Sequence, residues 1–334
     1  FKQKTAYEIG VRLVGSEMCI RDSPLARLNM DAMRGAIDVL WQVLAPILLT
    51  AGLGYLLARK VGLGPQGLSR AAFYVFSPCL LFDKFSHTQL SPADLGRVAA
   101  FTVLVMAGSG LIAWLLSWLF HFDRPLTSAF MLCAIAGNTG NYGLPANQFA
   151  FGEAALEPAV IYYAVSTLVL STVGVYLVAR GRQSGSAALR NVLTVPLAYA
   201  GILGLLVWAT GIKVPIPIER SAALAGQAAV PVMLVLLGVQ LADVRLRDDL
   251  GRISLAAATK LISGPLLGFA LAGPLGLSGI NRQSAILESS MPTAVMATVL
   301  ATEYDAAPQF TAGVVLMSTL GSIITVTAVI TLLQ

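Results

Sequence analysis

Charged residues are scarce in this chain. They make up 12% of its 334 residues, against roughly 25% in an ordinary soluble domain, while 56% of the residues are hydrophobic. So few charges cannot cover a water-facing surface, which excludes an ordinary soluble domain. The formal net charge of +5 does not indicate nucleic-acid binding, because the Lys and Arg residues fall in short loops between apolar runs.

Residues that build covalent, metal or catalytic sites are also few. Cys19, Cys79 and Cys133 are widely spaced, with no CxxC pair and no accompanying histidine, so we expect inert thiols rather than a disulfide framework or a metal site. His87 and His121 lie at the ends of apolar runs, and no paired aspartates, Ser–His arrangement or HExxH motif falls inside one. The sequence contains no Walker A motif. We therefore expect no catalytic residues, no metal, no cofactor and no ATP-driven pump.

The first 29 residues differ from the rest of the chain. The segment FKQKTAYEIGVRLVGSEMCIRDSPLARLN is polar and lacks the apolar core of a secretory signal. Most of it, KQKTAYEIGVRLVGSEMCIRDS, resembles a translated library adapter that occurs fused to unrelated sequences. We interpret residues 1–29 as a non-native or disordered leader and expect the natural start at Met30 or Met33.

Ten apolar segments are long enough to cross about 30 Å of hydrocarbon as helices. They lie at residues 37–58, 68–86, 96–120, 125–151, 157–179, 192–210, 219–241, 252–277, 280–303 and 307–333. A basic, Gly/Ser-rich linker at 181–191 separates a first five-helix repeat, 30–180, from a second, 192–334. The loops after spans one, three, five and seven hold more Lys and Arg than the opposite loops, so they are predicted to be cytoplasmic, with both termini outside.

Proline positions indicate an internal repeat of about 150 residues. Six prolines of the first half recur in the second half at offsets of 147 to 153 residues: Pro46, Pro65, Pro78, Pro125, Pro145 and Pro158 match Pro196, Pro215, Pro231, Pro274, Pro292 and Pro308. Because each half holds an odd number of spans, the second half must enter the membrane with opposite polarity. The sequence therefore predicts an all-α membrane protein built from two inverted five-helix repeats.

Spans four and nine are each predicted to break near the middle of the membrane. Span four contains GNTGNYGLP at 137–145, where three glycines weaken the helix and Pro145 removes a backbone donor. Span nine repeats the design as ESSMPT at 288–293. Broken backbone in hydrocarbon survives only inside protein or beside a watery cavity, so the two breaks should cross near the midplane.

The crossing predicts a site for an anion. After each break a new half-helix should begin with proline at or near its first position, and its free N–H groups and positive dipole end should face a cavity. Such ends favour carboxylates or phosphates. Polar side chains that can add donors are Asn138, Thr139, Asn141, Asn147 and Gln148 in span four, and Ser289, Ser290 and Thr293 in span nine. The alternative is a pair of proline kinks satisfied by neighbouring hydroxyl groups.

Two ionisable residues fall deep inside predicted spans, where charge is costly. Glu288, about one turn before Pro292, could carry a coupling proton or cation; alternatively a local hydroxyl or Lys260 satisfies its carboxyl group. Lys260 could attract the anion or pair with Glu288, and the alternative is that it snorkels towards the cytoplasm.

From about residue 36 to its end, the chain resembles the auxin efflux carrier family in its short bacterial form. The resemblance rests on GNTGNYGLPANQFAFGE at 137–153, on SSMPTAVMATVLATEYDAAPQFTAGVVL at 289–316 and on SGPLLG at 263–268. It implies a ten-helix fold like that of bile-acid symporters and sodium–proton antiporters, with the substrate at the crossing of helices four and nine. Helices 1, 2, 6 and 7 would form a scaffold and dimer interface, and helices 3–5 and 8–10 would slide against it as an elevator.

Carried over to this sequence, the crossover positions of the family are Asn138, Asn141, Pro145, Met291, Pro292 and Thr293. Plant members of the family export auxin, and bacterial members are associated with malate, malonate and similar carboxylates. The 181–191 linker is too short for the regulatory loop of many plant members. The first break is richer in glycine than the plant pattern, which leaves pocket shape and substrate open.

We therefore expect a secondary active transporter of a small organic anion, a mono- or dicarboxylate that is malate- or malonate-like or auxin-like. It would work in the bacterial inner membrane as a homodimer, coupled to a proton or to sodium. The alternatives are a sodium-coupled importer of the bile-acid symporter type, a channel or a receptor. A channel needs polar rings along a continuous pore, whereas the polar residues here gather near one depth.

Overall fold

The computed structural model describes residues 34–179, 195–242 and 249–334. In these residues the backbone is helical apart from short connections, and an isolated antiparallel bridge joins Gly137 to Thr293. The predicted leader, 1–29, and the predicted linker, 181–191, lie outside the described residues. For the described part of the chain, the all-α prediction is confirmed.

Six helices are long and apolar enough to cross a membrane. They are Arg34–Val61, which includes α3 (Ala45–Val61); α6 (Pro92–Leu119); Glu153–Val178, which includes α9 (Leu156–Val169); α13 (Ile216–Ala242); α14 (Leu250–Ala272); and α17 (Pro308–Leu333). The shortest, α14, has 23 residues. At about 1.5 Å per residue this is roughly 35 Å, enough for about 30 Å of hydrocarbon.

The other four predicted spans are helical in shorter pieces. These are α4 (Pro65–Ala71), η2 (Ala72–Phe76) and α5 (Ser77–Ser86); α7 (Arg124–Ile135), η3 (Thr139–Gly143) and α8 (Leu144–Phe151); α12 (Pro196–Thr210); and α15 (Gly279–Ser289) with α16 (Val295–Glu303). Ten membrane crossings in two inverted repeats remain a prediction.

Local sequence sets several helix ends. The Ser91 hydroxyl accepts a hydrogen bond from the Asp94 N–H at the start of α6, and the Asp123 carboxylate accepts one from the Leu126 N–H at the start of α7. At the end of α3, Gly62 adopts φ 73°, a left-handed conformation that glycine enters without steric cost. Polar caps and glycine therefore mark where apolar helices stop and loops begin.

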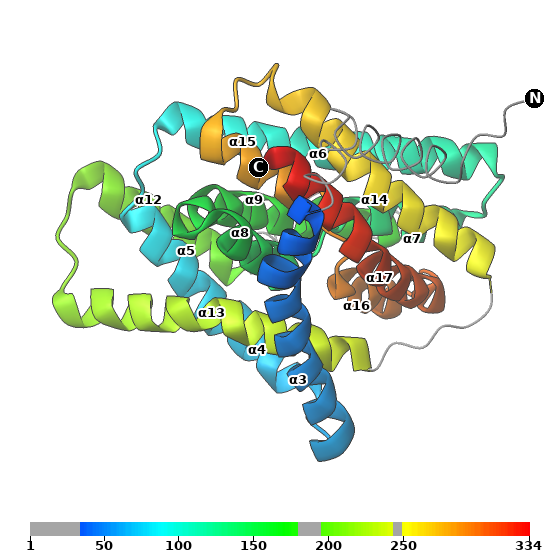
Figure 1. Cartoon of the computed structure of the whole chain (residues 1–334), viewed down its shortest axis with the longest axis horizontal. Helices are drawn as coiled ribbons and strands as arrows, with labels where there is room; N and C mark the ends of the chain where they lie inside the picture. Colours follow the sequence, from blue (N-terminus) through cyan, green and yellow to red (C-terminus); the bar gives the residue numbers. More distant parts are fainter. Residues whose placement is uncertain (1–33, 180–194, 243–248) are drawn as a thin grey trace, which may run out of the picture.

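One group of helices consists of α3, α5, α12 and α13, and we call it the α3–α13 group. In it α3 packs along α13, while α5 packs against α12 and α13; Figure 1 shows α3 crossing α13. The approach is very close: a Cβ added to Gly54 would lie 2.1 Å from the Val235 carbonyl oxygen, and one on Gly238 would lie 1.7 Å from that of Ala51. Glycine thus lets the two backbones touch, as in tightly packed membrane helices.

The second group contains the interrupted helices, and we call it the crossing group. Here α6 packs against α7, α9 and α14, and α14 packs against α15 and α17, with α16 beside α17 (Figure 1). The two groups meet where η3 and α8 contact α13, where α9 contacts α5 and α12, and where the first helix contacts α8 and α17 around Leu40–Leu44. The start of one half-helix therefore lies at the boundary between the groups.

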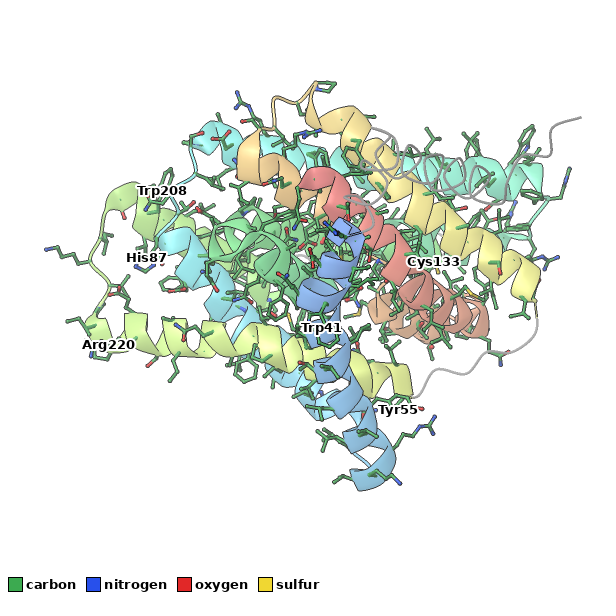
Figure 2. The ribbon with its side chains drawn as sticks, in the orientation of Figure 1. Trp41, Tyr55, His87, Cys133, Trp208 and Arg220 are labelled. Carbon is green, nitrogen blue, oxygen red and sulfur yellow. The ribbon has the colours of Figure 1, made fainter. Side chains whose placement is uncertain are left out.

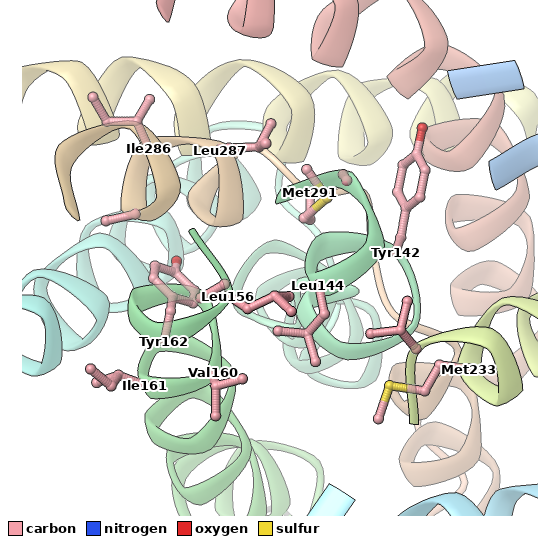
Figure 3. Close-up of a cluster of buried hydrophobic side chains, with 14 of the residues drawn as sticks. Tyr142, Leu144, Leu156, Val160, Ile161, Tyr162, Met233, Ile286, Leu287 and Met291 are labelled. Atoms are coloured by element: carbon pink, nitrogen blue, oxygen red, sulfur yellow. The ribbon is translucent and has the colours of Figure 1, made fainter. Parts of the chain in front are cut away.

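Buried apolar side chains hold the crossing group together behind the breaks. Figure 3 shows Leu144 of α8, Tyr162 of α9 and Leu287 of α15 in a single cluster with Met291. All four are at most 3% exposed. Removing such side chains from contact with lipid or water fixes α8, α9 and α15 relative to one another. The packing thereby positions the two breaks.

Candidate functional site

The two predicted interruptions are present, and they contact each other. In the first, α7 ends at Ile135 and helix resumes at Thr139; in the second, α15 ends at Ser289 and helix resumes at Val295. The Asn138 N–H donates to the Pro292 carbonyl oxygen at 2.7 Å, and the Ala294 N–H donates to the Ala136 carbonyl oxygen at 2.8 Å. Each break thus satisfies backbone groups that the other exposes, as a non-aqueous setting requires.

The position of the prolines differs from the prediction. Pro145 stands at the start of the regular helix α8, but helical backbone already begins six residues earlier with the π-helical turn η3. Pro292 lies in the extended connection, and α16 begins three residues after it at Val295. The first N–H groups of the two half-helices therefore belong to Thr139 and Val295 and their successors, because the four leading donors of a helix have no partner within it. Neither N-cap residue, Asn138 or Ala294, caps its helix with a side chain.

Both half-helix starts line one cavity of about 1010 Å³. Asn138 and Thr139, at most 5% exposed, line its buried part together with Gly140. Val295 contributes from the start of α16, and Arg70 of α4 lines its exposed end. Two positive helix-dipole ends thus open into the same space, which favours a negatively charged ligand.

Lys260 supplies a cation at the crossing. The residue lies on α14 and is 4% exposed, and its Nζ is 3.3 Å from the point that a Cβ on Gly137 would occupy. Within the described residues, no carboxylate lies at ion-pair distance from Lys260. The suggested pairing with Glu288 is therefore wrong, and so is snorkelling, because the side chain is turned into the protein. The ammonium group adds a positive charge next to Gly137, which lines the cavity two residues before η3 begins, although Lys260 is not itself among the lining residues.

Glu288 lies behind the crossing rather than in the cavity. Its side chain is fully buried and accepts a hydrogen bond at 2.9 Å from Asn147 Nδ2, which also donates to the Gly143 carbonyl oxygen. The suggested partners, a local hydroxyl or Lys260, do not bond to it in the described structure. Asn147 was predicted to face substrate, and instead it binds this carboxyl group.

The structure brings only some of the predicted substrate-binding residues to the cavity. Asn138, Thr139 and Asn141 line it. The others do not: Pro145 and Met291 are buried, Ser289 and Ser290 donate to the Ile286 carbonyl oxygen, Thr293 donates to the Cys133 carbonyl oxygen, Pro292 accepts from Asn138, and Gln148 donates to Glu153. Local hydrogen bonding to the preceding helical turn or to a neighbour occupies these groups.

Polar residues outside the breaks also line the cavity, and the sequence reasoning missed them. Gln240 accepts a hydrogen bond from Asn141 Nδ2 at 3.2 Å, and Ser166 lies 3.1 Å from the Thr139 hydroxyl. Thr298 faces the cavity from α16, with a buried hydroxyl that has no hydrogen-bond partner. A glutamine within the apolar run VPVMLVLLGVQLA of α13 was a usable signal, because an amide inside a membrane helix is costly unless it binds something.

A second polar cluster lies away from the crossing, at the ends of α5 and α13. His87 Nδ1 donates to the Asp83 carbonyl oxygen at 3.0 Å, and Nε2 lies 3.2 Å from a Glu219 carboxylate oxygen. Mainly the hydrogen bond to the Asp83 carbonyl raises the pKa of His87; partial burial opposes this, and Glu219 adds to it. Figure 2 shows His87 near Trp208 at this end of the molecule, where both line a cavity of about 420 Å³.

Comparison with known proteins assigns the family. The model of the family described as "Membrane transport protein" matches residues 39–330. The chain belongs to this family. Its resemblance to the auxin efflux carriers is thereby confirmed, and the chain is a multi-pass membrane protein of a transporter family.

The relatives carry transporter names. An "Uncharacterized transporter" of Methanothermobacter thermautotrophicus is 28% identical over 87% of this chain and 96% of its own length. Another of that description, from Methanocaldococcus jannaschii, is 26% identical over 71% of this chain and 80% of its own length. A Rhizobium meliloti protein named "Putative malonate transporter" is 27% identical over 84% of this chain and 92% of its own length. The likeness therefore extends over nearly the whole described structure.

Proposed function

We propose that this protein is a secondary active transporter of a small organic anion, a mono- or dicarboxylate of the malonate or malate type. The observation that carries the proposal is that two uncapped half-helix starts, at Thr139 and Val295, line one cavity beside the ammonium group of Lys260. Backbone N–H groups and an ammonium ion form short, charge-assisted hydrogen bonds with carboxylates.

The cavity suits a ligand with an anionic end and a larger body. Its volume of about 1010 Å³ exceeds what malonate needs and leaves room for an aromatic acid of the auxin type. Arg70 at the exposed end gives a second cation for a second carboxylate. The malonate name of the Rhizobium meliloti relative makes malonate the first compound to test.

The packing of helices supports two inverted repeats. In the proposed repeat, α3, α5, α6 and α9 of the first half correspond to α12, α13, α14 and α17 of the second half. The contact of α3 with α13 then has its counterpart in the contact of α12 with α5, and the contact of α6 with α9 has its counterpart in that of α14 with α17. All four contacts are present. In the same way, α6 against α7 corresponds to α14 against α15. We propose that the α3–α13 group is the scaffold and that the crossing group moves against it as an elevator, carrying the substrate past the boundary where η3 meets α13.

The cavity runs towards one side of the proposed membrane. Its exposed end is formed by Gln66, Arg70 and Glu303, which belong to the loop regions after spans one and nine, on the side predicted to be cytoplasmic. On this proposal the structure is inward-open, both termini are outside, and the protein lies in the bacterial inner membrane. A homodimer through the α3–α13 group and coupling to a proton or sodium gradient complete the proposal.

Binding and exchange in purified protein test this function. Malonate, malate, succinate and indole-3-acetate should each be screened for a rise in melting temperature, which reports ligand binding to the folded state. Compounds that stabilise the protein should then exchange across proteoliposomes against the same labelled compound. If no member of the panel stabilises the protein or exchanges, the proposed function is wrong.

A single residue allows the half-helix N–H groups to be tested directly. Ala294, the residue before Val295, has φ −74° and ψ 145°, a conformation that precedes proline well. Val295→Pro therefore removes one N–H from the cavity at a helix position where proline is tolerated. Its matched control, Val295→Ala, shortens the same side chain and keeps the N–H.

We expect Val295→Pro to weaken carboxylate binding about tenfold or more relative to Val295→Ala, because a hydrogen bond to a charged group contributes about 1.5–3 kcal/mol. Titration with malonate, or with whichever panel member binds, measures the difference. Equal affinities in the two variants would show that this backbone donor does not bind the anion.

A further inference from the structure

Behind the crossing, two side chains that contact each other each keep one buried acceptor atom without a hydrogen-bond partner. Glu288 Oε2 and Asn147 Oδ1 are both buried and accept no hydrogen bond. The same two side chains are already joined on their other atoms, because Asn147 Nδ2 donates to Glu288 Oε1 at 2.9 Å. An unpaired buried acceptor is costly, and two on one contacting pair require a common explanation.

A proton on Glu288 satisfies both atoms at once. A carboxylic acid and a primary amide are complementary: the amide N–H donates to the acid carbonyl oxygen, and the acid O–H donates to the amide oxygen. The existing Asn147–Glu288 hydrogen bond is the first half of this pair. With Oε2 protonated, its O–H becomes the donor that Asn147 Oδ1 lacks. An ionised Glu288 would instead leave a full charge buried with one donor.

The surroundings of Glu288 offer no cation to replace that proton. Among the described elements packed against α15, α14 presents Lys260, which forms no ion pair, and α9 presents Tyr162, which lies within electrostatic range of Glu288. On α6, Arg97 is exposed and forms an ion pair with Asp94 at 3.0 Å, and Glu157 at the start of α9 accepts a hydrogen bond from the Gln89 N–H. The η3 turn adds Tyr142, the short helix η4 (Glu153–Ala155) carries the exposed Glu153, and α8 and α17 contain no ionisable residue. On α15 itself Arg282 is the other ionisable residue. A proton is therefore the partner that the pocket accommodates.

The geometry points to Glu288, paired with Asn147, as the site of a coupling proton that travels with the anion; this rests on the transport function proposed above. In loading, a proton from water bonds to Glu288 Oε2 and neutralises the carboxylate. In release, that O–H bond breaks and the proton returns to water on the other side. Proton and anion favour each other, because an ionised Glu288 behind η3 would repel an anion bound at its start.

Gly143 keeps this site compact. A Cβ on Gly143 would lie 2.2 Å from Glu288 Oε2, so the carboxyl group packs directly on the backbone that follows the first break. The Gly143 carbonyl oxygen also accepts from Asn147 Nδ2. A change in the charge of Glu288 therefore acts directly on η3, whose first residues line the cavity.

Glu288→Gln tests the proton site with little change of shape. A glutamine amide can form both hydrogen bonds to Asn147, so it imitates the protonated acid but cannot release a proton. In proteoliposomes loaded with a pH-sensitive dye, wild type should move protons with malonate, and E288Q should lose that proton movement and uphill accumulation. Asp38→Asn, which removes an exposed carboxylate elsewhere, is the control and should behave as wild type.

Infrared spectroscopy gives a readout that does not depend on transport. Glu288 is the sole buried acid among the described residues. Wild type at neutral pH should therefore show the carbonyl stretch of a protonated carboxyl group, shifted in D2O, and E288Q should lose it. If wild type lacks this band, the inference is wrong even when carboxylates bind; if the band is present but no carboxylate binds, the proposed function fails instead.

Three further outcomes of the transport and binding measurements support or overturn the assignment of the proton to Glu288. Proton movement that persists unchanged in E288Q overturns the assignment. Transport that depends on sodium rather than on pH, with sodium dependence lost in E288Q, assigns a cation to this pocket and equally overturns it. A fall in malonate affinity with rising pH, measured where malonate is doubly ionised and absent in E288Q, supports it.

Discussion

Replacing Gly264 of α14 with alanine should disturb the second break. A Cβ there would lie 2.1 Å from the Ser289 carbonyl oxygen, whereas real Cβ contacts stay at or beyond 3.0 Å, so α15 must retreat by about 0.9 Å (3.0 − 2.1). Ser289 is the last residue of α15. The displacement therefore reaches the connection that leads to Val295 and the cavity.

The magnitude follows from two opposing effects. Overpacking against backbone costs about 1–3 kcal/mol, and replacing a mid-helix glycine by alanine returns up to about 1 kcal/mol. Gly251 is the matched control, because it lies on the same helix with no atom near its would-be Cβ and gains helix propensity alone. The two variants should thus differ by about 1–3 kcal/mol, or roughly 1–4 °C in melting temperature for a chain of 334 residues.

Thermal unfolding in one detergent, with and without malonate, checks both the stability and the site. Gly264→Ala should melt below Gly251→Ala and should also bind malonate more weakly, because its α16 start has moved. A Gly264→Ala protein that melts at or above the control would show that α14 and α15 do not pack as closely as the structure has them.

Four further substitutions test individual side chains. Asn141→Ala and Gln240→Ala remove the two ends of one 3.2 Å hydrogen bond. Each should lower malonate affinity about fivefold, roughly 1 kcal/mol, and titration of the double variant should show no further loss. Lys260→Met, which keeps length and loses charge, should lower affinity at least about tenfold; unchanged affinity would remove Lys260 from the site. Because the pKa of His87 is raised in the folded protein, its contribution to stability is present below the unfolded value of about 6.5 and disappears as pH rises through the folded value. His87→Gln should therefore melt below wild type at acidic pH and match it at alkaline pH.

The breaks could be predicted from sequence because their causes are local. Glycine weakens a helix and proline removes a donor wherever they stand, so 137–145 and 288–293 were identifiable without any neighbour. The residue at which the first half-helix begins was harder to predict from sequence. The turn η3 forms π-helical backbone ahead of Pro145, because Gly143 can donate to the Asn138 carbonyl oxygen once Asn138 is held by Pro292. That anchor comes from residues more than 150 positions away.

The direction in which each polar side chain points also could not be predicted from sequence. Asn147 and Asn141 lie six residues apart in one segment, yet one binds buried Glu288 and the other lines the cavity with Gln240. Polarity alone suggested that both face substrate. Which of them does so depends on the rotation of η3 and α8 against α13 and α15, and no residue type encodes that rotation by itself.

The sequence by itself determined the membrane character, the helical segments and the two places where helices cannot continue, because apolar length, glycine and proline act within a few residues of chain. Only the tertiary structure decided that the two breaks hydrogen-bond to each other and that Lys260 and Glu288 do not form an ion pair. It also decided which polar groups reach the cavity. These outcomes depend on packing between segments that are distant in the sequence, where backbone donors and buried charges find partners that no local pattern specifies.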